Sequence, residues 1–302
     1  MTQSIKYYLG IDGGGTKTEF RMTDSAGNLL GCALLGASNP NDIGFDATCA
    51  LLGQGICRVT EKYDRSAISV FAGIAGAATG DHAARIRSYL ATLGFAKADA
   101  ASDVHLALAA CLGDADGIAV IMGTGSVAFA QCGGEVLRAG GYGYLLGDAG
   151  SGFALGQGAI LAALQAEDGS GAPTLLHDMV AMQCNKARVL DALSDFYCKG
   201  KTEIAHYAPL IFEAHAKGDA VATEILLRNV RAIADLIRAI ATRMGKDHIS
   251  VVLCGGLMAK SAVILPLLQD ALANDAREYS LSVSEAAPVQ GALYLAGKLG
   301  VA

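Results

Sequence analysis

Charged residues and proline are both scarce in this chain of 302 residues. Asp, Glu, Lys and Arg make up 17% of it and the hydrophobic set 52%, a balance that excludes a disordered chain and a coiled coil. Glycine is abundant instead, with 38 residues against 5 prolines, so the glycines do not belong to a low-complexity linker. Because glycine weakens a helix or strand by about 1 kcal/mol relative to alanine, the excess marks places where the backbone needs an unusual conformation or a close approach.

Positive charge is the rarer sign, with 23 Lys and Arg against 29 Asp and Glu, and the net charge is −6. Without a basic run the chain has no general attraction for nucleic acid or for an anionic membrane surface, so we expect a small-molecule partner, no nucleic acid and no membrane. The start of the chain, MTQSIKYYLG, lacks the basic and apolar regions of a signal peptide. The uncharged stretch 117–134 is interrupted by glycines and hydroxyl groups, which a membrane helix disfavours. These absences favour a cytoplasmic location.

Metal-binding patterns of cysteine and histidine are missing as well. The 8 cysteines contain no C-x2-C pair, and the 6 histidines show no ligand spacing. We therefore expect free thiols in a reducing compartment, not a disulfide framework or a cysteine-bound metal. The cysteines are Cys32, Cys49, Cys57, Cys111, Cys132, Cys184, Cys198 and Cys254.

Strand and helix patterns alternate in two blocks, as in an α/β protein with two sheets. The first block has strand patterns at 6–11, 18–23, 29–35, 67–73 and 98–102, and helix patterns at 45–63, at 81–93 and from 104. The second block has strand patterns within 117–130, 135–139 and 251–258, and helix patterns after 151, at 219–244, at 262–273 and from 288. Along 219–244 apolar residues recur at spacings of four and three, which indicates a core-facing helix that ends at Gly245.

The two blocks contain a repeated sequence pattern. Residues 7–23 and 117–130 both have a strand, a glycine turn with Thr, and a second strand. Two copies suggest two halves of related design that face each other across a ligand-binding cleft. Glycine turns leave backbone N–H groups unobstructed, and such groups bind phosphate. The phosphate-binding candidates are Gly13, Gly14, Gly15, Thr16, Lys17 and Thr18 in the first turn and Gly123, Thr124, Gly125 and Ser126 in the second.

Neither turn is one of the common nucleotide motifs. A Walker A loop needs Gly-Lys-Ser/Thr, whereas here Thr16 precedes Lys17, and a dinucleotide fingerprint needs a helix where this sequence predicts a strand. Taken singly, each turn also fits a plain hairpin, and it is the pair that favours phosphate binding. Asp12, at the end of the first strand, is a candidate ligand for Mg2+, directly or through water, because this cation prefers carboxylate oxygen.

These motifs resemble the actin-like ATPase superfamily, which includes sugar kinases and Hsp70 proteins. Residues 12–18 and the GTGS turn look like its two phosphate segments, and the strand-Gly-Gly-helix unit with Gly255 and Gly256 looks like its adenosine segment. Within the superfamily the chain is most similar to the N-acetylglucosamine and glucosamine kinase branch of the BadF/BadG/BcrA/BcrD ATPase family.

The resemblance implies an α/β fold of two ribonuclease H-like (actin-like ATPase) domains with a cleft between them. It places the first domain at 1–115, on the sugar and phosphate side, joined by the C-terminal helix 289–302. It places the second domain at 116–288, on the adenosine side, with helical insertions. The resemblance also implies a homodimer.

Phosphoryl transfer to a hydroxyl needs a carboxylate that orients the attacking oxygen or accepts its proton. Asp103 follows a predicted strand and precedes a predicted helix, and its place ahead of the GTGS turn matches the catalytic aspartate of the family. The alternative is that Asp103 or Ser102 only caps the helix. We interpret Asp114 and Asp116 as loop carboxylates.

Sugar recognition needs several polar groups close together, and the segment 139–152, AGGYGYLLGDAGSG, resembles the sugar-binding segment of the family. Tyr142 stands where the family has Trp and Ala149 where it has Glu, so the group at C2 of the sugar stays open. The sugar contacts that the resemblance implies are Asn39, Gly76, Gly141, Tyr142 and Asp148.

Together the motifs and the resemblance predict an ATP- and Mg2+-dependent kinase that phosphorylates the 6-hydroxyl of N-acetylglucosamine. Within the class the alternative is a glucosamine kinase of the same fold, and outside it a BadF-type ATPase activator or switch protein without a sugar substrate. Plainer interpretations also stay open. They are a helix cap at Asp148 or Ser151, an ordinary loop at 73–80, and a plain turn at Gly255 and Gly256.

Overall fold

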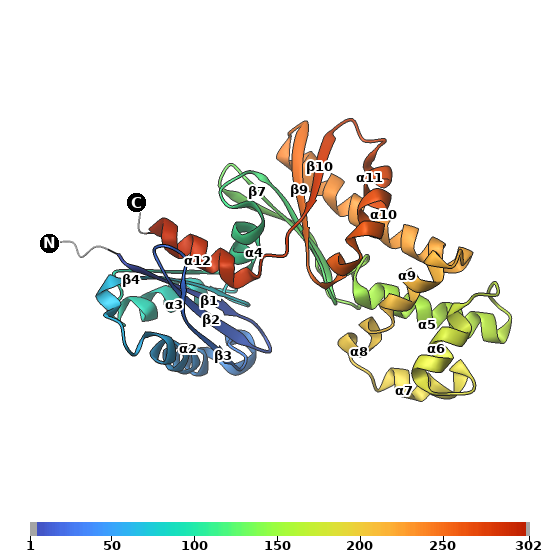
Figure 1. Ribbon diagram of the computed structural model, residues 1–302, viewed down its shortest axis with the longest axis horizontal. Helices are drawn as coiled ribbons and strands as arrows, with labels where there is room; N and C mark the ends of the chain where they lie inside the picture. The colour runs from blue at the N-terminus through green and yellow to red at the C-terminus, as the bar shows by residue number, and fades with distance from the viewer. Residues whose placement is uncertain (1–4, 300–302) are drawn as a thin grey trace. The chain divides into compact units, whose positions relative to one another are not determined.

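The computed structural model describes residues 5–299, which form two compact units (Figure 1). Unit 1 contains the described parts of 1–115 and 286–302, and unit 2 contains 116–285. Residues 1–4, in the segment searched for a signal peptide, and residues 300–302, at the end of the predicted C-terminal helix, lie outside the described residues.

Unit 1 is built on a five-stranded sheet with the order β3–β2–β1–β4–β5. β2 pairs antiparallel with β1 and β3, whereas β4 runs parallel to β1 and β5. The strands are β1 (Tyr7–Gly13), β2 (Thr18–Asp24), β3 (Leu29–Leu35), β4 (Ile68–Ile74) and β5 (Lys97–Ala101). The helices are α1 (Pro40–Ile43), α2 (Phe45–Thr60), α3 (His82–Ala91), α4 (Asp103–Leu112) and α12 (Pro288–Leu299), with a 3-10 turn at Arg65–Ala67.

Unit 2 repeats this plan with the strand order β10–β9–β6–β7–β8. β7 pairs antiparallel with β6 and β8, and β9 runs parallel to β6 and β10. The strands are β6 (Gly117–Met122), β7 (Ser126–Cys132), β8 (Glu135–Gly140), β9 (His248–Cys254) and β10 (Glu278–Val283). The helices are α5 (Gly152–Asp168), α6 (Leu176–Cys184), α7 (Leu193–Tyr197), α8 (Lys201–Ala205), α9 (Ala208–Ala216), α10 (Ala220–Met244) and α11 (Ser261–Leu272), with 3-10 turns at Val189–Ala192 and Gly256–Lys260.

The two sheets have the same topology, with β6 in the place of β1 and β9 in the place of β4. The predicted α/β fold with two related sheets is confirmed. Because β1, β4 and β5 are parallel, their carboxyl ends meet at one edge of the unit 1 sheet, and β6, β9 and β10 do the same in unit 2. Ligands of α/β proteins bind outside this edge, so both sheets place their strand-to-loop junctions where a site is expected.

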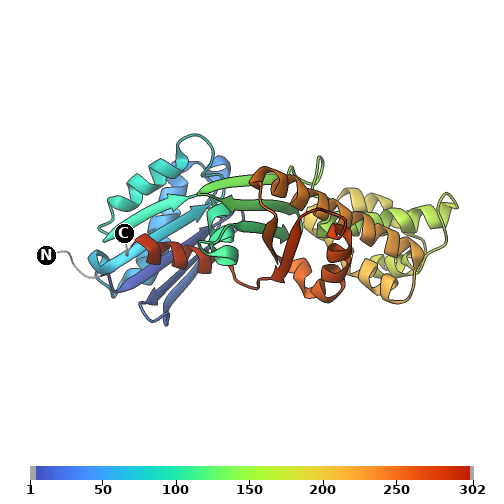
Figure 2. The same cartoon turned by 90° about the horizontal axis from the view of Figure 1, so that it is seen from above.

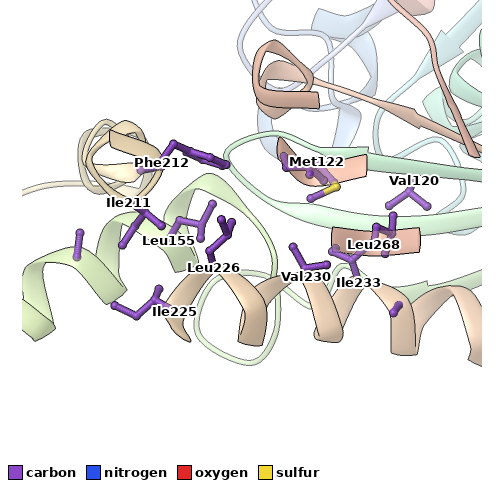
Figure 3. Close-up of a cluster of buried hydrophobic side chains, with 14 of the residues drawn as sticks. Val120, Met122, Leu155, Ile211, Phe212, Ile225, Leu226, Val230, Ile233 and Leu268 are labelled. Atoms are coloured by element: carbon purple, nitrogen blue, oxygen red, sulfur yellow. The ribbon is translucent and has the colours of Figure 1, made fainter. Parts of the chain in front are cut away.

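The core of unit 2 forms where α10 packs against β6, β7 and β8 and α11 packs against β10, with α5 and α9 packed on α10, and Figure 3 shows part of it. The apolar stripe predicted for the helix at 219–244 lies in this core and is confirmed. Its buried members are Leu226, Val230, Ile233, Ile237, Ile240 and Met244. The helix begins after Asp219, whose carboxylate accepts a hydrogen bond from the N–H of Ala222 at 2.8 Å, and it ends before Gly245. Among the described residues, no helix has the length and apolarity needed to span a membrane.

Helix α12, at the end of the chain, returns to unit 1 and lies beside β1 and α4 (Figures 1 and 2). Its Ala292 and Ala296 are buried with Phe71 of β4 and Leu106 of α4. The hydroxyl of Ser69 in β4 also donates a hydrogen bond to the carbonyl of Ala296 at 2.6 Å. Residues distant in the sequence therefore complete the core of the first unit.

Two glycines let α12 approach so closely. A Cβ atom at Gly10 of β1 would lie 2.9 Å from the carbonyl oxygen of Val289, and one at Gly291 would overlap the carbonyl oxygen of Leu106. Such distances are shorter than real Cβ contacts allow. Part of the glycine excess therefore serves helix packing, with no direct role in a ligand site.

Strand β10 is missing from the sequence prediction. Its side chains alternate between exposed and half-buried along Glu278–Val283, and it pairs parallel with β9 at the edge of the sheet. The predicted helix at 45–63 also ends earlier, at Thr60. The other predicted strands and the long helices are present in both units.

We expect two alanine substitutions in α12 to have opposite effects. Gly291→Ala should lower the free energy of unfolding by about 2 kcal/mol, because the added methyl group overpacks the contact with α4. Gly297→Ala has open space around its Cβ and should raise stability by up to about 1 kcal/mol through helix propensity. Urea unfolding of both variants measures this. Equal effects of the two substitutions would contradict the close packing of α12 on α4.

Candidate functional site

The carboxyl edge of the unit 1 sheet brings two aspartates together. In the strand register Asp12 of β1 lies opposite Gly73 of β4, and Gly73 lies opposite Ala101 of β5. Asp103 follows β5 as the first residue of α4, after the N-cap residue Ser102. The side chain of Ser102 makes no capping hydrogen bond to the helix. Both aspartates are half-buried.

The two carboxylates influence each other electrostatically. The pKa of Asp12 is raised to about 6, mainly by burial and further by the negative charges of Asp103 and Glu19, against the opposing charge of Lys17. Burial also raises the pKa of Asp103, against the backbone N–H groups that stabilise its charged form. Lys17 offsets the burial of these two neighbouring carboxylates only in part, so the pair favours an added cation.

Mg2+ fits this donor set. It binds carboxylate oxygen and is usually held by one or two carboxylates together with water and substrate phosphates. Among residues 5–299, no three His, Cys, Asp or Glu side chains converge into a complete metal site. Asp12 and Asp103 therefore suit a metal that arrives with a phosphate ligand better than a permanently bound one.

The first glycine turn is held in place by its neighbours. The N–H of Gly14 donates to the carbonyl of Lys17 at 2.9 Å, and the carbonyl of Gly13 accepts from the N–H of Ala75 at 2.7 Å. A side chain at Gly13 would overlap the hydroxyl of Ser38. The turn is thus fixed against the loops that follow β3 and β4.

The exposed part of this turn is open. Gly15, Thr16 and Lys17 are exposed, and the backbone N–H groups of Gly15 and Thr16 donate to no group among residues 5–299. Thr18 lies differently: its buried hydroxyl donates a 2.8 Å hydrogen bond to the carbonyl of Gly36 and lies at hydrogen-bond distance, 2.8 Å, from the hydroxyl of Ser38. Thr18 therefore supports the turn from within the fold.

Asn39 and Gly76, both predicted from the sequence, lie together beside this turn. The side chain of Asn39 accepts a hydrogen bond from the N–H of Asn41 at 3.0 Å, and donates one to Asp42 at 2.8 Å. Any side chain at Gly76 would overlap the amide of Asn39. Asn41 in turn donates to the hydroxyl of Thr79 at 3.3 Å, which connects the two loops.

Asn41 and Asp42 were not among the predicted site residues. The Asp42 carboxylate points toward the first glycine turn, where an added Cβ at Gly15 would lie 3.6 Å from its oxygen. The polar run that follows Pro40 in the sequence was the signal for these two residues. The structure therefore adds an amide and a carboxylate to this part of unit 1.

In unit 2 the GTGS turn is joined to the start of α5. The N–H of Gly123 donates to the carbonyl of Gly125 at 2.9 Å, and the carbonyl of Gly123 accepts from Gly152 at 2.8 Å. The buried hydroxyl of Ser126 donates to the carbonyl of Ala149 at 2.7 Å. The N–H groups of Thr124 and Gly125 donate to no group within 5–299, so this turn also presents open donors.

Asp148 lies directly against this turn. It is a non-glycine residue with a φ of 59°, and its side chain is 4% exposed. Its carboxylate accepts a hydrogen bond from the ammonium of Lys201 at 2.6 Å. An added Cβ at Gly125 would lie 2.7 Å from both charged groups. Lys201 was missed because it belongs to a short helix far along the chain.

The loop between β8 and Asp148 is glycine-rich and exposed. Gly141 has a φ of 69° and packs on Val127, while the ring of Tyr142 is 68% exposed and packs on Gly147. The guanidinium of Arg138 lies 6.0 Å from the centre of this ring. The aromatic face of Tyr142 is accessible from solvent.

Gly255 and Gly256 lie at the same edge of the unit 2 sheet as the GTGS turn. Gly255 follows β9 with a φ of 101°, and an added Cβ there would lie 2.6 Å from the carbonyl oxygen of Met122, the residue that precedes the turn. Gly256 has open space around it. The structure thus brings the predicted adenosine segment beside the predicted phosphate segment.

Comparison with known sequences identifies relatives over most of the chain. Residues 9–296 match the sequence pattern of the BadF/BadG/BcrA/BcrD ATPase family. The chain is 30% identical to an N-acetylmuramic acid/N-acetylglucosamine kinase from Clostridium acetobutylicum, over 84% of this chain and 86% of that one. It is 27% identical to an N-acetyl-D-glucosamine kinase from Dictyostelium discoideum, over 97% of this chain and 98% of that one.

Solved structures share the fold. A candidate N-acetylglucosamine kinase from Chromobacterium violaceum superposes with a TM-score of 0.68 at 28% identity, over 97% of this chain and 99% of that one. A ROK family glucokinase from Streptomyces griseus superposes with a TM-score of 0.55 at 16% identity, over 97% and 98% of the chains, which shows the fold alone. The predicted pair of actin-like ATPase domains is confirmed.

The raised pKa of Asp12 predicts a pH-dependent cost in stability. Because its folded pKa of about 6 exceeds the ordinary value of 3.8, ionised Asp12 destabilises the fold, fully above pH 6 and progressively less down to pH 3.8. Asp12→Asn should therefore raise the thermal midpoint in metal-free buffer at pH 8. At pH 5 the difference in thermal midpoint between Asp12→Asn and the parent protein should be about half of its value at pH 8.

Asp24→Asn is the matched control. Hydrogen bonds from Asn28 hold the pKa of Asp24 below its ordinary value of 3.8. The stability that ionised Asp24 gives the fold is therefore lost only below that pH. Its effect on the midpoint should be equal at pH 5 and pH 8. A gain for Asp12→Asn that does not change with pH would show that Asp12 carries no unfavourable charge.

Proposed function

The chain belongs to the BadF/BadG/BcrA/BcrD ATPase family, and from that premise we propose that it is an ATP-dependent kinase that phosphorylates the 6-hydroxyl of N-acetylglucosamine. The observation that carries the proposal is the pair of half-buried carboxylates, Asp12 and Asp103, beside an open glycine turn. The amino-sugar kinase names of the relatives support the substrate class.

Asp103 is the proposed general base. It stands at the first position of α4, and burial raises the pKa of its carboxyl, which makes it a better proton acceptor than an exposed aspartate. In the proposed reaction its carboxylate orients the sugar hydroxyl and accepts its proton as the oxygen attacks the terminal phosphorus of ATP. The bond from that phosphorus to the bridging oxygen breaks, and ADP leaves with the electron pair.

Asp12 is the proposed ligand of Mg2+, directly or through water. When bound with the nucleotide, Mg2+ would neutralise the charge of the phosphates and of the two aspartates. The aspartate pair is thus suited to act only when the metal and phosphate are present. Lys17 on the first turn adds a second positive group near Asp12.

The two glycine turns are the proposed phosphate sites. In unit 1 the proposed phosphate-binding residues are Gly13, Gly14, Gly15, Thr16, Lys17 and Thr18, and the open N–H groups are those of Gly15 and Thr16. In unit 2 they are Gly123, Thr124, Gly125 and Ser126, and the open N–H groups are those of Thr124 and Gly125. Gly255 and Gly256 are the proposed adenosine contacts, which assigns the adenosine to unit 2 and the reacting hydroxyl to unit 1. The position of Gly255 against the residue before the GTGS turn supports this division.

The proposed sugar contacts are Asn39, Gly76, Gly141, Tyr142 and Asp148. Asn39 and Gly76 support one another in unit 1, and the exposed ring of Tyr142 offers an apolar face to a sugar ring in unit 2. An amide, an aromatic face and a carboxylate are the groups that recognise hydroxyls and an N-acetyl substituent. A cytoplasmic homodimer remains part of the proposal.

One relative supports an alternative substrate. The chain is 27% identical to a glucosamine kinase from Vibrio cholerae, over 97% of this chain and 97% of that one, and glucosamine differs from N-acetylglucosamine only at C2. The other alternative is an ATP-driven switch, to which the family's ATPase name would equally apply. The acceptor dependence of ADP release separates all three.

We expect Asp103→Asn to lower turnover by about 100-fold or more, because the amide cannot accept the proton of the attacking hydroxyl. The dissociation constants for ATP and sugar should change little, since the amide keeps the shape of the carboxylate. Steady-state kinetics and calorimetric titration measure the two effects. Asp114→Asn, which removes an exposed carboxylate paired with Lys298, should leave turnover unchanged. Near-normal turnover of Asp103→Asn would remove Asp103 from the mechanism.

ADP release from the purified protein should depend on the sugar supplied. We expect the highest rate with N-acetylglucosamine, lower rates with glucosamine, N-acetylmannosamine and glucose, and background release without sugar. The 6-deoxy analogue of N-acetylglucosamine should give no turnover, because it lacks the attacking hydroxyl. A preference for glucosamine would select the alternative kinase, and ADP release that ignores the sugar would select the switch.

A further inference from the structure

The ion pair between Asp148 and Lys201 lies at the GTGS turn, and the two charged groups differ in exposure. The carboxylate is 4% exposed, whereas the lysine side chain is 29% exposed. Asp148 is therefore the more buried partner of the pair, and Lys201 is the more exposed one. Both groups lie 2.7 Å from the position that a Cβ of Gly125 would occupy.

The place of Lys201 is fixed by helix packing. Lys201 opens α8, and this helix packs on α5: an added Cβ at Gly156 of α5 would overlap the carbonyl of Ile204, and one at Gly152 would lie 3.5 Å from Ala205. Gly152 is the residue whose N–H binds the GTGS turn. The backbone that carries Lys201 is thus connected to the turn through α5.

The chemistry at this point favours a phosphate ligand for Lys201. The turn presents open backbone N–H donors but no charged side chain of its own, and the charged groups beside it are the carboxylate of Asp148 and the ammonium of Lys201. An ammonium has three donors, so it can bind a phosphate oxygen while it still faces a carboxylate. Without such a cation, Asp148 would repel a nucleotide at this turn.

We propose that Lys201 binds a phosphate of the nucleotide at the GTGS turn and that its bond to Asp148 makes nucleotide and sugar binding interdependent. The inference rests on the proposed function, in which Asp148 contacts the sugar. When a phosphate shares the ammonium, Asp148 has more acceptor capacity for a sugar hydroxyl. By linkage, the nucleotide strengthens sugar binding and the sugar strengthens nucleotide binding by the same factor.

The first test compares ligands with and without phosphate. Lys201→Met should raise the dissociation constant of adenylyl imidodiphosphate, a non-hydrolysable ATP analogue, by about tenfold or more and leave that of adenosine unchanged. Lys201→Arg should retain most of the affinity because it keeps the charge. Lys217→Met, which removes an exposed lysine of the same unit, should change neither constant. Equal affinities of Lys201→Met and the parent protein for the analogue would overturn the proposal.

A double variant separates phosphate binding from simple relief of repulsion. If Lys201 acts only by neutralising Asp148, then Lys201→Met with Asp148→Asn should recover the affinity for the ATP analogue. We expect the double variant to remain weak, because the phosphate still lacks its ammonium partner. Full recovery would reduce Lys201 to a structural counter-ion and overturn the inference.

The coupling is measured by titrating N-acetylglucosamine with and without saturating ATP analogue. The parent protein should bind the sugar about fivefold or more tightly in the presence of the analogue, and Lys201→Met should show a ratio near one. A ratio that Lys201→Met leaves unchanged would overturn the link through Asp148. If the parent protein binds neither ligand, the proposed function itself fails; if it binds both and the variant behaves identically, only this inference does.

Discussion

The burial of two neighbouring carboxylates, Asp12 and Asp103, is the constraint on which the rest of the candidate site depends. Strand pairing places the ends of β1, β4 and β5 side by side, so the two carboxylates are held close whether or not a counter-charge is present. The fold tolerates the unfavourable energy of these carboxylates because the parallel strands, α4 and α12 together fix the positions of Asp12 and Asp103. A site built in this way is ready for a cation that arrives with its substrate.

In unit 2 the carboxylate beside the glycine turn is balanced by a lysine. Its sheet has the same topology, and its GTGS turn occupies the position of the first glycine turn, yet the carboxylate beside it, Asp148, is neutralised by Lys201 within the protein. In unit 1 Lys17 offsets the aspartate pair only in part, whereas unit 2 contains a balanced ion pair. This difference suits a division in which metal and proton chemistry belong to unit 1, and phosphate binding without a protein-bound metal belongs to unit 2.

Local patterns in the sequence predicted most of the fold and the part of the site that follows strand ends. Asp12, Asp103 and both glycine turns are set by strand-to-loop junctions, which sequence patterns reveal. Strand β10 was missed although its alternation of Tyr279, Leu281 and Val283 with polar residues was visible. The contact between Lys201 and Asp148 was not visible at all, because it depends on how α8 packs against α5.

The glycine excess separates into residues that the fold needs and residues that it does not. Gly10, Gly13 and Gly291 have no space for a side chain, and glycines with positive φ are needed for their backbone conformation. In contrast, Gly123 and Gly256 have open space and no positive φ, so folding alone would permit alanine there. Both follow parallel strands at the carboxyl edge of the unit 2 sheet. A glycine that the fold does not require, at the edge where the proposed phosphate and adenosine contacts lie, supports the proposed close approach of a ligand to the backbone.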